Sequence, residues 1–364
     1  MADHSLFMQA ALREASKGRG YTSPNPAVGA VLVANGKIVA TGYHERAGAP
    51  HAEVECLKSH SGSVPADATL YVTLEPCSTI GRTPACTEAI IRSGVRNVVV
   101  GATDPNPPHR GRGIRLLRAA GLTVHTGILT EECTALNEAF NYWVQTKRPF
   151  VIAKCGMTLD GRLTRAPREK QWITSVAARR HANLLRAQVD AILIGAGTLR
   201  LDNPRLTIRS ARGAPQPWRV VLSRSGRVPE NAHLFSDKFA HRTLLFRDHG
   251  LADVLKSLGE REVTSVLIEG GGNVLGQALD QKLIHRVHIY FAPLMSGGPV
   301  VAFSGKGASN TSDGVRLCDP QYEQIGRDIF LSAKTLYRHG SSEQHGETYR
   351  LESGSMDTQQ ELNK

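Results

Sequence analysis

The sequence predicts a two-domain α/β protein. Segments typical of strands and of helices alternate along most of the 364 residues, and a hydrophobic content of 41% can supply a core for each of two domains. The pattern breaks at Lys147-Arg148-Pro149, after which a new apolar strand begins at Phe150. We therefore expect a first domain at residues 1–147, a second at 148–338 and a tail at 339–364.

The first domain is expected to open with a helix at residues 4–17, because apolar residues recur along one side and Gly18 and Gly20 follow. Asn35-Gly36 is typical of a tight hairpin turn, which predicts paired strands at 27–34 and 37–43. The remaining expected elements are helices at 52–59, from Pro84, at 111–120 and at 131–144, and strands at 69–74, 95–101 and 122–126. Together they predict α/β/α layering.

The second domain is expected to contain another α/β sheet. Its predicted strands are residues 150–154, 190–194, 219–222, 243–246, 263–268 and 285–291, and its predicted helices are 195–201 and 272–280. The tail has almost no large apolar residues, so we expect it to be disordered.

The net charge of +11 is concentrated in the second half of the chain. Residues 1–149 carry 15 basic and 12 acidic residues, whereas residues 150–337 carry 26 and 16. The basic residues form no blocks interleaved with aromatics, which disfavours a nucleic-acid partner and favours small phosphorylated ligands. One basic cluster is compatible with either an exposed helix face or phosphate contacts: Arg110, Arg112, Arg115 and Arg118.

The chain has no run of 18 apolar residues, and its start does not resemble a signal peptide. We therefore expect a cytoplasmic protein that does not bind membranes. Its six cysteines are then expected to be reduced and available to a metal.

A metal-ligand pattern lies in the first domain. His51 offers a ring nitrogen, and Cys77 and Cys86 offer two sulfurs, a set that suits Zn²⁺ and leaves the fourth tetrahedral position for water. Glu53 would be superfluous in a structural zinc site, but it can transfer protons in a deaminase. The base deaminases share His-x-Glu followed by Pro-Cys and a second Cys, although the two cysteines here are nine positions apart instead of three. The pattern predicts a catalytic zinc site.

Motifs along the chain, through about residue 337, resemble those of the bifunctional pyrimidine deaminase/uracil reductase family of riboflavin biosynthesis. They are Ser23 to Gly29, His44 to Glu53, Pro76 to Cys86, Lys154 to Arg162, Gln171 to Thr174, Asp202-Asn203-Pro204 and Glu269-Gly270-Gly271. The resemblance implies a cytidine-deaminase-like domain followed by a dihydrofolate-reductase-like domain. It also implies zinc-dependent deamination of a phosphoribosylamino-pyrimidinone and reduction of its ribose by NADPH.

The resemblance also implies roles for individual residues. Zinc is expected on His51, Cys77 and Cys86, with Glu53 as the catalytic proton donor. NADPH contacts are expected at Gly156, Trp172, Thr198, Asp202, Gly271, Gly272, Asn273, Val274, Leu275, Gly276 and Gln277. Substrate contacts are expected at Asn25, His44, Lys154, Lys170, Arg186, Leu206, Arg209 and Glu269. The family usually has a histidine after Cys77-Ser78, where this chain has Thr79-Ile80, so one substrate contact is in question.

Several of these residues have a simpler interpretation from the sequence alone. Trp172 is compatible with a core position, and Asp202 is either an acid/base group near the sugar or the cap of a turn. Arg186 and Arg209 suit bidentate contacts with the substrate phosphate, but either is also compatible with an exposed surface. The glycines from Gly270 could let backbone amides approach the cofactor phosphates, or simply form a turn.

Two other classes of protein share part of this pattern. A nucleic-acid-acting deaminase with a degenerate second domain would need a strand-binding face in residues 1–149, where the net charge is only +3. A non-catalytic zinc module would need neither Glu53 nor the motifs of the second domain. We expect an enzyme that acts on a small phosphorylated pyrimidine, as a homo-oligomer with a dimer favoured.

Overall fold

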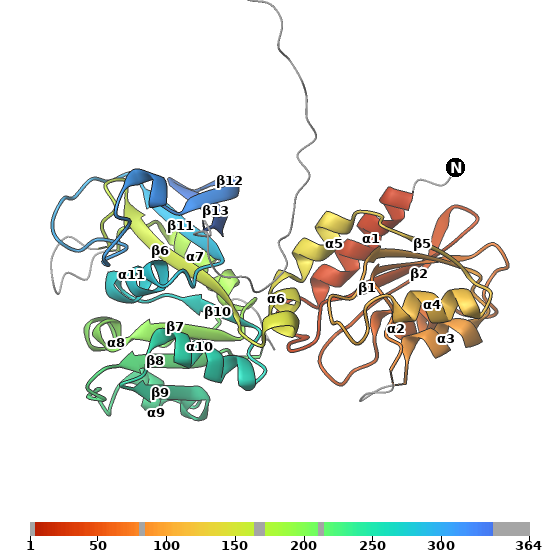
Figure 1. Cartoon of the computed structure of the whole chain (residues 1–364), viewed down its shortest axis with the longest axis horizontal. Coiled ribbons are helices and arrows are strands. Elements are labelled where there is room, and N and C mark those ends of the chain that lie inside the picture. Colours follow the sequence, from red (N-terminus) through yellow and green to blue (C-terminus); the bar gives the residue numbers. More distant parts are fainter. Residues whose placement is uncertain (1–3, 80–83, 164–171, 210–214, 338–364) are drawn as a thin grey trace, which may run out of the picture.

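The computed structural model describes residues 4–79, 84–163, 172–209 and 215–337, which form two domains side by side, each built on its own β-sheet (Figure 1). Lys170, Ile80 and the expected tail at 339–364 lie outside the described residues. Within the described ranges, no helix is both long and apolar enough to cross a membrane.

The first domain has a five-stranded sheet in the order β2-β1-β3-β4-β5. Strand β1 pairs antiparallel with both β2 and β3, whereas β3, β4 and β5 run parallel. The strands are β1 (Gly29–Ala34), β2 (Lys37–Tyr43), β3 (Thr69–Leu74), β4 (Asn97–Ala102) and β5 (Thr123–Thr126). The helices are α1 (His4–Lys17), α2 (Ala52–Ser59), α3 (Cys86–Ser93), α4 (Arg112–Ala119) and α5 (Thr130–Leu136).

Alternating residues of β1 show how this sheet is covered on both faces. Leu32 packs in a cluster that includes residues of α2, α3 and α4, whereas Val31 and Val33 pack in a cluster with α1 and α5. Helices therefore lie on both sides of the sheet, as Figure 1 shows, and the predicted α/β/α layering is confirmed.

The single helix expected at 131–144 is wrong, because the structure has α5 and α6 (Glu138–Thr146) separated at Asn137. The Asn137 side chain accepts a hydrogen bond from Ala27 N (2.8 Å) and donates one to Ala27 O (2.9 Å). These two bonds hold Asn137 at φ −115° and ψ 25°, outside helical geometry.

The second domain has an eight-stranded sheet in the order β12-β13-β11-β6-β10-β7-β8-β9. All its pairs are parallel except β11 with β13 and β13 with β12. The strands are β6 (Phe150–Thr158), β7 (Ala191–Gly195), β8 (Trp218–Ser223), β9 (Thr243–Arg247), β10 (Ser265–Ile268), β11 (Arg286–Ala292), β12 (Arg316–Ile325) and β13 (Asp328–Leu336). The helices are α7 (Val176–Arg186), α8 (Ala196–Asp202), α9 (His233–Ser236), α10 (Leu251–Glu260) and α11 (Gly272–Asp280), with short 3-10 helices at Ala240–Arg242 and Thr311–Asp313.

The predicted α/β sheet is confirmed, but the sequence expectations do not include α7, α10 or the β12–β13 hairpin. Helix α10 does carry a detectable signal, since Leu251, Val254, Leu255 and Leu258 recur at helical spacing and are all buried. Strand β12 carries almost none, because nine of its ten residues are exposed or only partly buried.

The two domains meet at α6, which lies between them in Figure 1. Trp143 of α6 donates a hydrogen bond from Nε1 to Gly259 O in the second domain (2.9 Å). Arg286 of β11 forms a bidentate ion pair with Glu138 of α6, with distances of 2.9 and 2.7 Å. The linker is therefore packed against the second domain by directional contacts.

Candidate active sites

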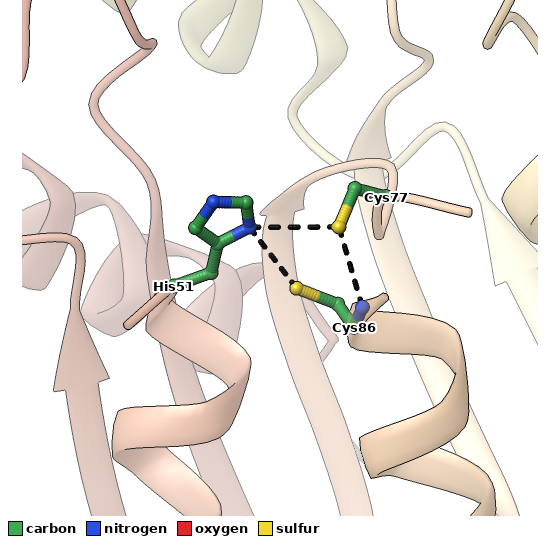
Figure 2. Close-up of side chains that lie close together, drawn as sticks. All are labelled: His51, Cys77 and Cys86. Atoms are coloured by element: carbon green, nitrogen blue, oxygen red, sulfur yellow. Dashed lines mark hydrogen bonds between the residues drawn. The ribbon is translucent and has the colours of Figure 1, made fainter. Parts of the chain in front are cut away.

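Three side chains converge at one end of the first sheet. His51 immediately precedes α2, Cys77 follows β3, and Cys86 is the first residue of α3, as the sequence predicts. His51 Nδ1 lies 3.1 Å from Cys86 Sγ and 3.5 Å from Cys77 Sγ, and the three donor atoms all lie within 4.8 Å of one another (Figure 2). The structure thus brings together three residues from separate parts of the chain.

This donor set fits a zinc ion. Tetrahedral bonding at the usual Zn–N and Zn–S lengths places nitrogen and sulfur about 3.6 Å apart and two sulfurs about 3.8 Å apart. The observed nitrogen–sulfur distances of 3.1 and 3.5 Å are close to that spacing. One nitrogen and two sulfurs also leave room for a non-protein ligand, as in catalytic zinc sites.

The thiol groups already differ in acidity. Hydrogen bonds from Cys86 and His51 outweigh burial and lower the pKa of the Cys77 thiol. The hydrogen bond to Cys77, together with burial, raises the pKa of Cys86. A bound cation would stabilise both as thiolates.

Glu53 lies in the first turn of α2, two residues after His51, and is only 3% exposed. Burial, with a smaller contribution from the Cys77 charge, raises the pKa of Glu53 to about 7. A carboxyl group with this pKa can both take up and release a proton near neutral pH, which a general acid/base requires.

Asn25 and His44 are hydrogen-bonded to each other beside the donor triangle. His44 Nδ1 lies 3.0 Å from Pro50 O, which can only accept, so Nδ1 carries the proton and Nε2 accepts from Asn25 Nδ2 (3.1 Å). Burial lowers the pKa of His44, in agreement with a neutral ring. The His44 ring meets that of His51 edge-on at 5.1 Å, so this pair lies next to the metal ligands.

Glu75 was not predicted to have a role, yet it organises the same end of the sheet. Its carboxylate accepts backbone hydrogen bonds from Asp104 (3.1 Å), Gly111 (2.9 Å), Gly113 (2.9 Å) and Ile114 (3.3 Å). Glu75 thereby fixes the segment after β4 beside Pro76-Cys77. An acidic residue at the end of a buried strand, just before a metal-ligand motif, was the signal available in the sequence.

That segment adds polar groups to the site. Asp104 and His109 lie in it, and the Cys77 charge contributes to raising the pKa of Asp104, after the larger effect of burial. Among the described residues, Ser78 Oγ and His109 Nδ1 have no hydrogen-bond partner. Loops after neighbouring parallel strands meet at one sheet edge, so the position of Asp104 after β4 could have identified it.

The four arginines near α4 are exposed, as one of the two sequence interpretations required.

In the second domain, the structure brings together Lys154 of β6, Arg186 of α7 and Glu269, which follows β10. Arg186 and Glu269 form a bidentate pair at 2.7 and 2.8 Å, and Lys154 Nζ lies 3.7 Å from the same carboxylate. Burial alone would raise the pKa of Glu269, but Lys154 and Arg186 outweigh it and lower the pKa to about 2. This cluster is therefore a buried carboxylate held by two cations.

The expected glycine loop is mostly helical. Gly271 is the N-cap of α11, and residues 272–277 form its first turns. Val274 and Leu275 lie in the hydrophobic core, so their side chains are not available to a cofactor. A Cβ at Gly272 would lie 2.0 Å from Val301 O, and one at Gly276 would lie 2.3 Å from Ser304 O. These two glycines are needed for packing against the segment after β11.

Other expected cofactor residues lie near the start of α11. Thr198 Oγ1 accepts a hydrogen bond from Gly271 N (3.0 Å), and Asn273 Oδ1 accepts one from Gln277 Nε2 (2.6 Å). A Cβ at Gly156 would approach Thr174 Cγ2 at 2.9 Å. The contact between Thr198 and Gly271 joins α8 to α11 at the carboxyl ends of β7 and β10.

The remaining expected residues are more dispersed. Trp172 is 74% exposed, with Arg179 over its ring at 4.9 Å, so the core interpretation is wrong. Asp202 is the last residue of α8; the residue is exposed, but partial desolvation of its carboxyl group raises its pKa. Leu206 is buried, whereas Arg209 is exposed and held by a backbone hydrogen bond to Asn183 Oδ1 (2.9 Å). The described contacts do not join these residues to the Lys154 cluster.

Both domains match known protein families. A model described as the cytidine and deoxycytidylate deaminase zinc-binding region matches residues 1–102, and one described as the RibD C-terminal domain matches residues 149–331. The riboflavin biosynthesis protein RibD of Actinobacillus pleuropneumoniae is 39% identical over 357 residues, covering 89% of this chain and 93% of that relative. The chain belongs to the RibD family. It is a two-domain deaminase and reductase of riboflavin biosynthesis.

Solved structures of the RibD family agree with this fold. Acinetobacter baumannii RibD matches with a TM-score of 0.85 and 33% identity, over 92% of this chain and 99% of that one. A Thermotoga maritima protein described as a diaminohydroxyphosphoribosylaminopyrimidine deaminase/5-amino-6-(5-phosphoribosylamino)uracil reductase matches with a TM-score of 0.84 and 34% identity, over the same shares. The predicted fold class and the resemblance stated from the motifs are confirmed.

Proposed function

We propose that the chain deaminates 2,5-diamino-6-(5-phosphoribosylamino)pyrimidin-4(3H)-one and then reduces the ribosyl group of the product to give 5-amino-6-(5-phosphoribitylamino)uracil. The observation that carries the proposal is the His51, Cys77 and Cys86 donor triangle beside buried Glu53, in a chain whose second domain matches the RibD C-terminal domain. The substrate is that of the similar Thermotoga maritima enzyme. We place the boundary between the domains at residues 147 and 148.

In the first site, His51, Cys77 and Cys86 would hold zinc, which when bound lowers the pKa of water and makes it a nucleophile. Glu53 would carry the protons of that reaction, one to the ring nitrogen and a second to the leaving amine, which departs as ammonia. Asn25, fixed by His44, presents its amide to the pyrimidine edge. Glu75 keeps the Asp104 segment in place around the substrate.

In the second site, NADPH would supply the hydride for reduction of the ribose, and the protein would position the two molecules. Thr198 and the N-terminal end of α11 form the proposed cofactor side, where free backbone N–H groups favour a phosphate. Lys154 and Glu269 lie on the substrate side and can orient the sugar hydroxyls. Asp202 remains the proposed acid/base group or orienter.

Arg209 is the better placed of the two arginines for the substrate phosphate. Arg186 already makes two hydrogen bonds to Glu269, whereas the Arg209 side chain is exposed and the described contacts give it no ion pair. We therefore assign the phosphate to Arg209, and assign Arg186 to holding Glu269 in position.

The proposal is tested by following ammonia release and NADPH oxidation separately on the purified chain, with the synthetic phosphorylated substrate. We expect both activities, with Glu53→Gln removing only the first and Lys154→Ala only the second. Absence of either half-reaction in the unaltered protein would contradict the corresponding assignment. Size measurement of the same sample would test the proposed homodimer.

A further inference from the structure

A cavity of about 350 Å³ lies between the two domains; Asn25 lines it, whereas His51, Cys77 and Cys86 do not. The first domain contributes the loop after α1 and the junction of α5 with α6, and the second contributes α7 and the starts of β6 and β10. Its volume is in the range of small-molecule sites. It is lined in part by the aromatic rings of Phe140, Phe150 and Phe330.

Among the described residues, one cation of this cavity, Arg19, makes no direct ion pair. Glu138 is paired with Arg286, and Asp190 accepts hydrogen bonds from Thr264 N (2.7 Å), Thr264 Oγ1 (2.6 Å) and Ser265 N (3.2 Å). Arg19 is exposed and lines the cavity; the charge of Glu138 acts on its guanidinium, but Arg19 forms no direct ion pair with a described residue. Its guanidinium is therefore available to an anion at the cavity opening.

His288, in the same wall, has a ring nitrogen without a hydrogen-bond partner among the described residues. This nitrogen is Nδ1, and the residue is 9% exposed. Burial, with the nearby charge of Arg286, lowers the pKa of His288 to about 3, so the ring is neutral and has one donor and one acceptor. A buried polar atom without a partner is uncommon in native proteins and points to water, an ion or a ligand as the missing partner.

His181, another histidine of the cavity wall, already has a hydrogen-bond partner. Its Nδ1 lies 2.7 Å from Tyr290 OH, on the strand that also carries His288. Arg19 and His288 are therefore two polar groups of the wall that a ligand can engage, set among aromatic side chains. An anionic group would pair with Arg19, while a flat ring would pack on the phenylalanines and offer polar edge atoms to His288.

We propose that this interdomain cavity is a binding site for a small organic anion that carries a flat ring, and that it shares only Asn25 with the residues assigned to the two catalytic sites. The proposal does not depend on either catalytic assignment. Because both domains form the walls, a bound molecule stabilises their docking and raises the melting temperature of the whole chain.

Uridine 5′-monophosphate is a suitable probe because it combines a phosphate with a flat, polar-edged ring. Calorimetric titration of the full chain should show binding that falls at least tenfold in Arg19→Ala, which removes the unpaired cation. Ala139→Trp, which fills the cavity from α6 without removing a polar group, should have the same effect. Arg13→Ala, an exposed arginine of α1 outside the cavity, is the matched control and should bind as the unaltered chain does.

Uridine and inorganic phosphate should each bind at least tenfold more weakly than the nucleotide, and both half-reactions should keep their rates in Arg19→Ala. Unchanged nucleotide affinity in Arg19→Ala would place the probe in a catalytic site and overturn the proposal. Absence of nucleotide binding, or phosphate binding as tight as that of the nucleotide, would also overturn it. If Ala139→Trp does not fold, Arg19→Ala still decides the matter.

Discussion

Arg186 holds Glu269 through two hydrogen bonds, from Nε to Oε1 at 2.7 Å and from Nη2 to Oε2 at 2.8 Å. The fork geometry of the guanidinium matches both carboxylate oxygens, and both side chains are largely removed from solvent. This pair gives the two arginines of the second site, Arg186 and Arg209, different expected functions.

Replacing each arginine by alanine should separate these functions. Arg209→Ala is expected to raise the Michaelis constant of the phosphorylated substrate by roughly 10-fold to 100-fold, the usual range for a lost charge-assisted hydrogen bond, with unchanged stability. Arg186→Ala should instead destabilise the protein by about 3 kcal/mol, because it leaves the buried Glu269 carboxylate with Lys154 as its one remaining cation. Kinetics and urea unfolding of both variants would check this, and equal stability of the two variants would contradict it.

The stability contributed by Glu269 should depend on pH. Its pKa in the folded protein is about 2, below the unpaired value of 4.5, so the ionised carboxylate stabilises the fold above pH 4.5. That contribution, about 3 kcal/mol at most, should be lost as the pH falls from 4.5 toward 2. Urea unfolding should therefore show a gap between the unaltered protein and Glu269→Gln that narrows below pH 4.5. Glu260→Gln, an exposed control on α10, should show no such gap.

Glu53→Gln tests the acid/base assignment. The variant should retain its metal and lose ammonia release by roughly 10²-fold to 10⁴-fold, because an amide cannot transfer the proton. Reduction should continue at the normal rate, since Lys154 and Glu269 lie in the other domain. Glu55→Gln, on the same helix, is the control. Loss of metal from Glu53→Gln would show that Glu53 is a ligand and not the proton carrier.

Two neighbouring glycines should respond differently to alanine. Gly272→Ala would place its Cβ 2.0 Å from Val301 O, a backbone atom, and should destabilise the second domain by about 1–3 kcal/mol. Gly271→Ala would meet only the Thr198 hydroxyl, at 3.3 Å, and should change stability by less than about 0.5 kcal/mol. Thermal unfolding would compare them, and a similar loss in both would argue against the close approach at Gly272.

The sequence predicts the elements of the first domain, and the positions of His51, Cys77 and Cys86 on them, because these signals are local. A run of residues that favour strands predicts β3, and a proline before Cys86 predicts the start of α3. The contacts that organise the site are not local. Glu75 reaches backbone groups about 30 to 40 residues away, from Asp104 to Ile114, and neither periodicity nor composition records such contacts.

The second domain was harder to predict for two physical reasons. Strand β12 exposes most of its residues, so apolar alternation does not identify it. The glycines of α11 resemble a phosphate-binding loop in sequence, whereas Gly272 and Gly276 are required by the backbone that packs against them. The sequence also does not predict the ion pair between Arg186 and Glu269, because each residue alone is compatible with a substrate contact.

The central claim is that His51, Cys77 and Cys86 hold a catalytic zinc ion. The most direct measurement is the zinc content of the purified chain together with its rate of ammonia release, compared with Cys86→Ser and with Cys56→Ser, a buried cysteine of α2 outside the donor triangle. We predict one zinc per chain in the unaltered protein and in Cys56→Ser, and loss of both zinc and ammonia release in Cys86→Ser. Full zinc occupancy with normal deamination in Cys86→Ser would contradict the account.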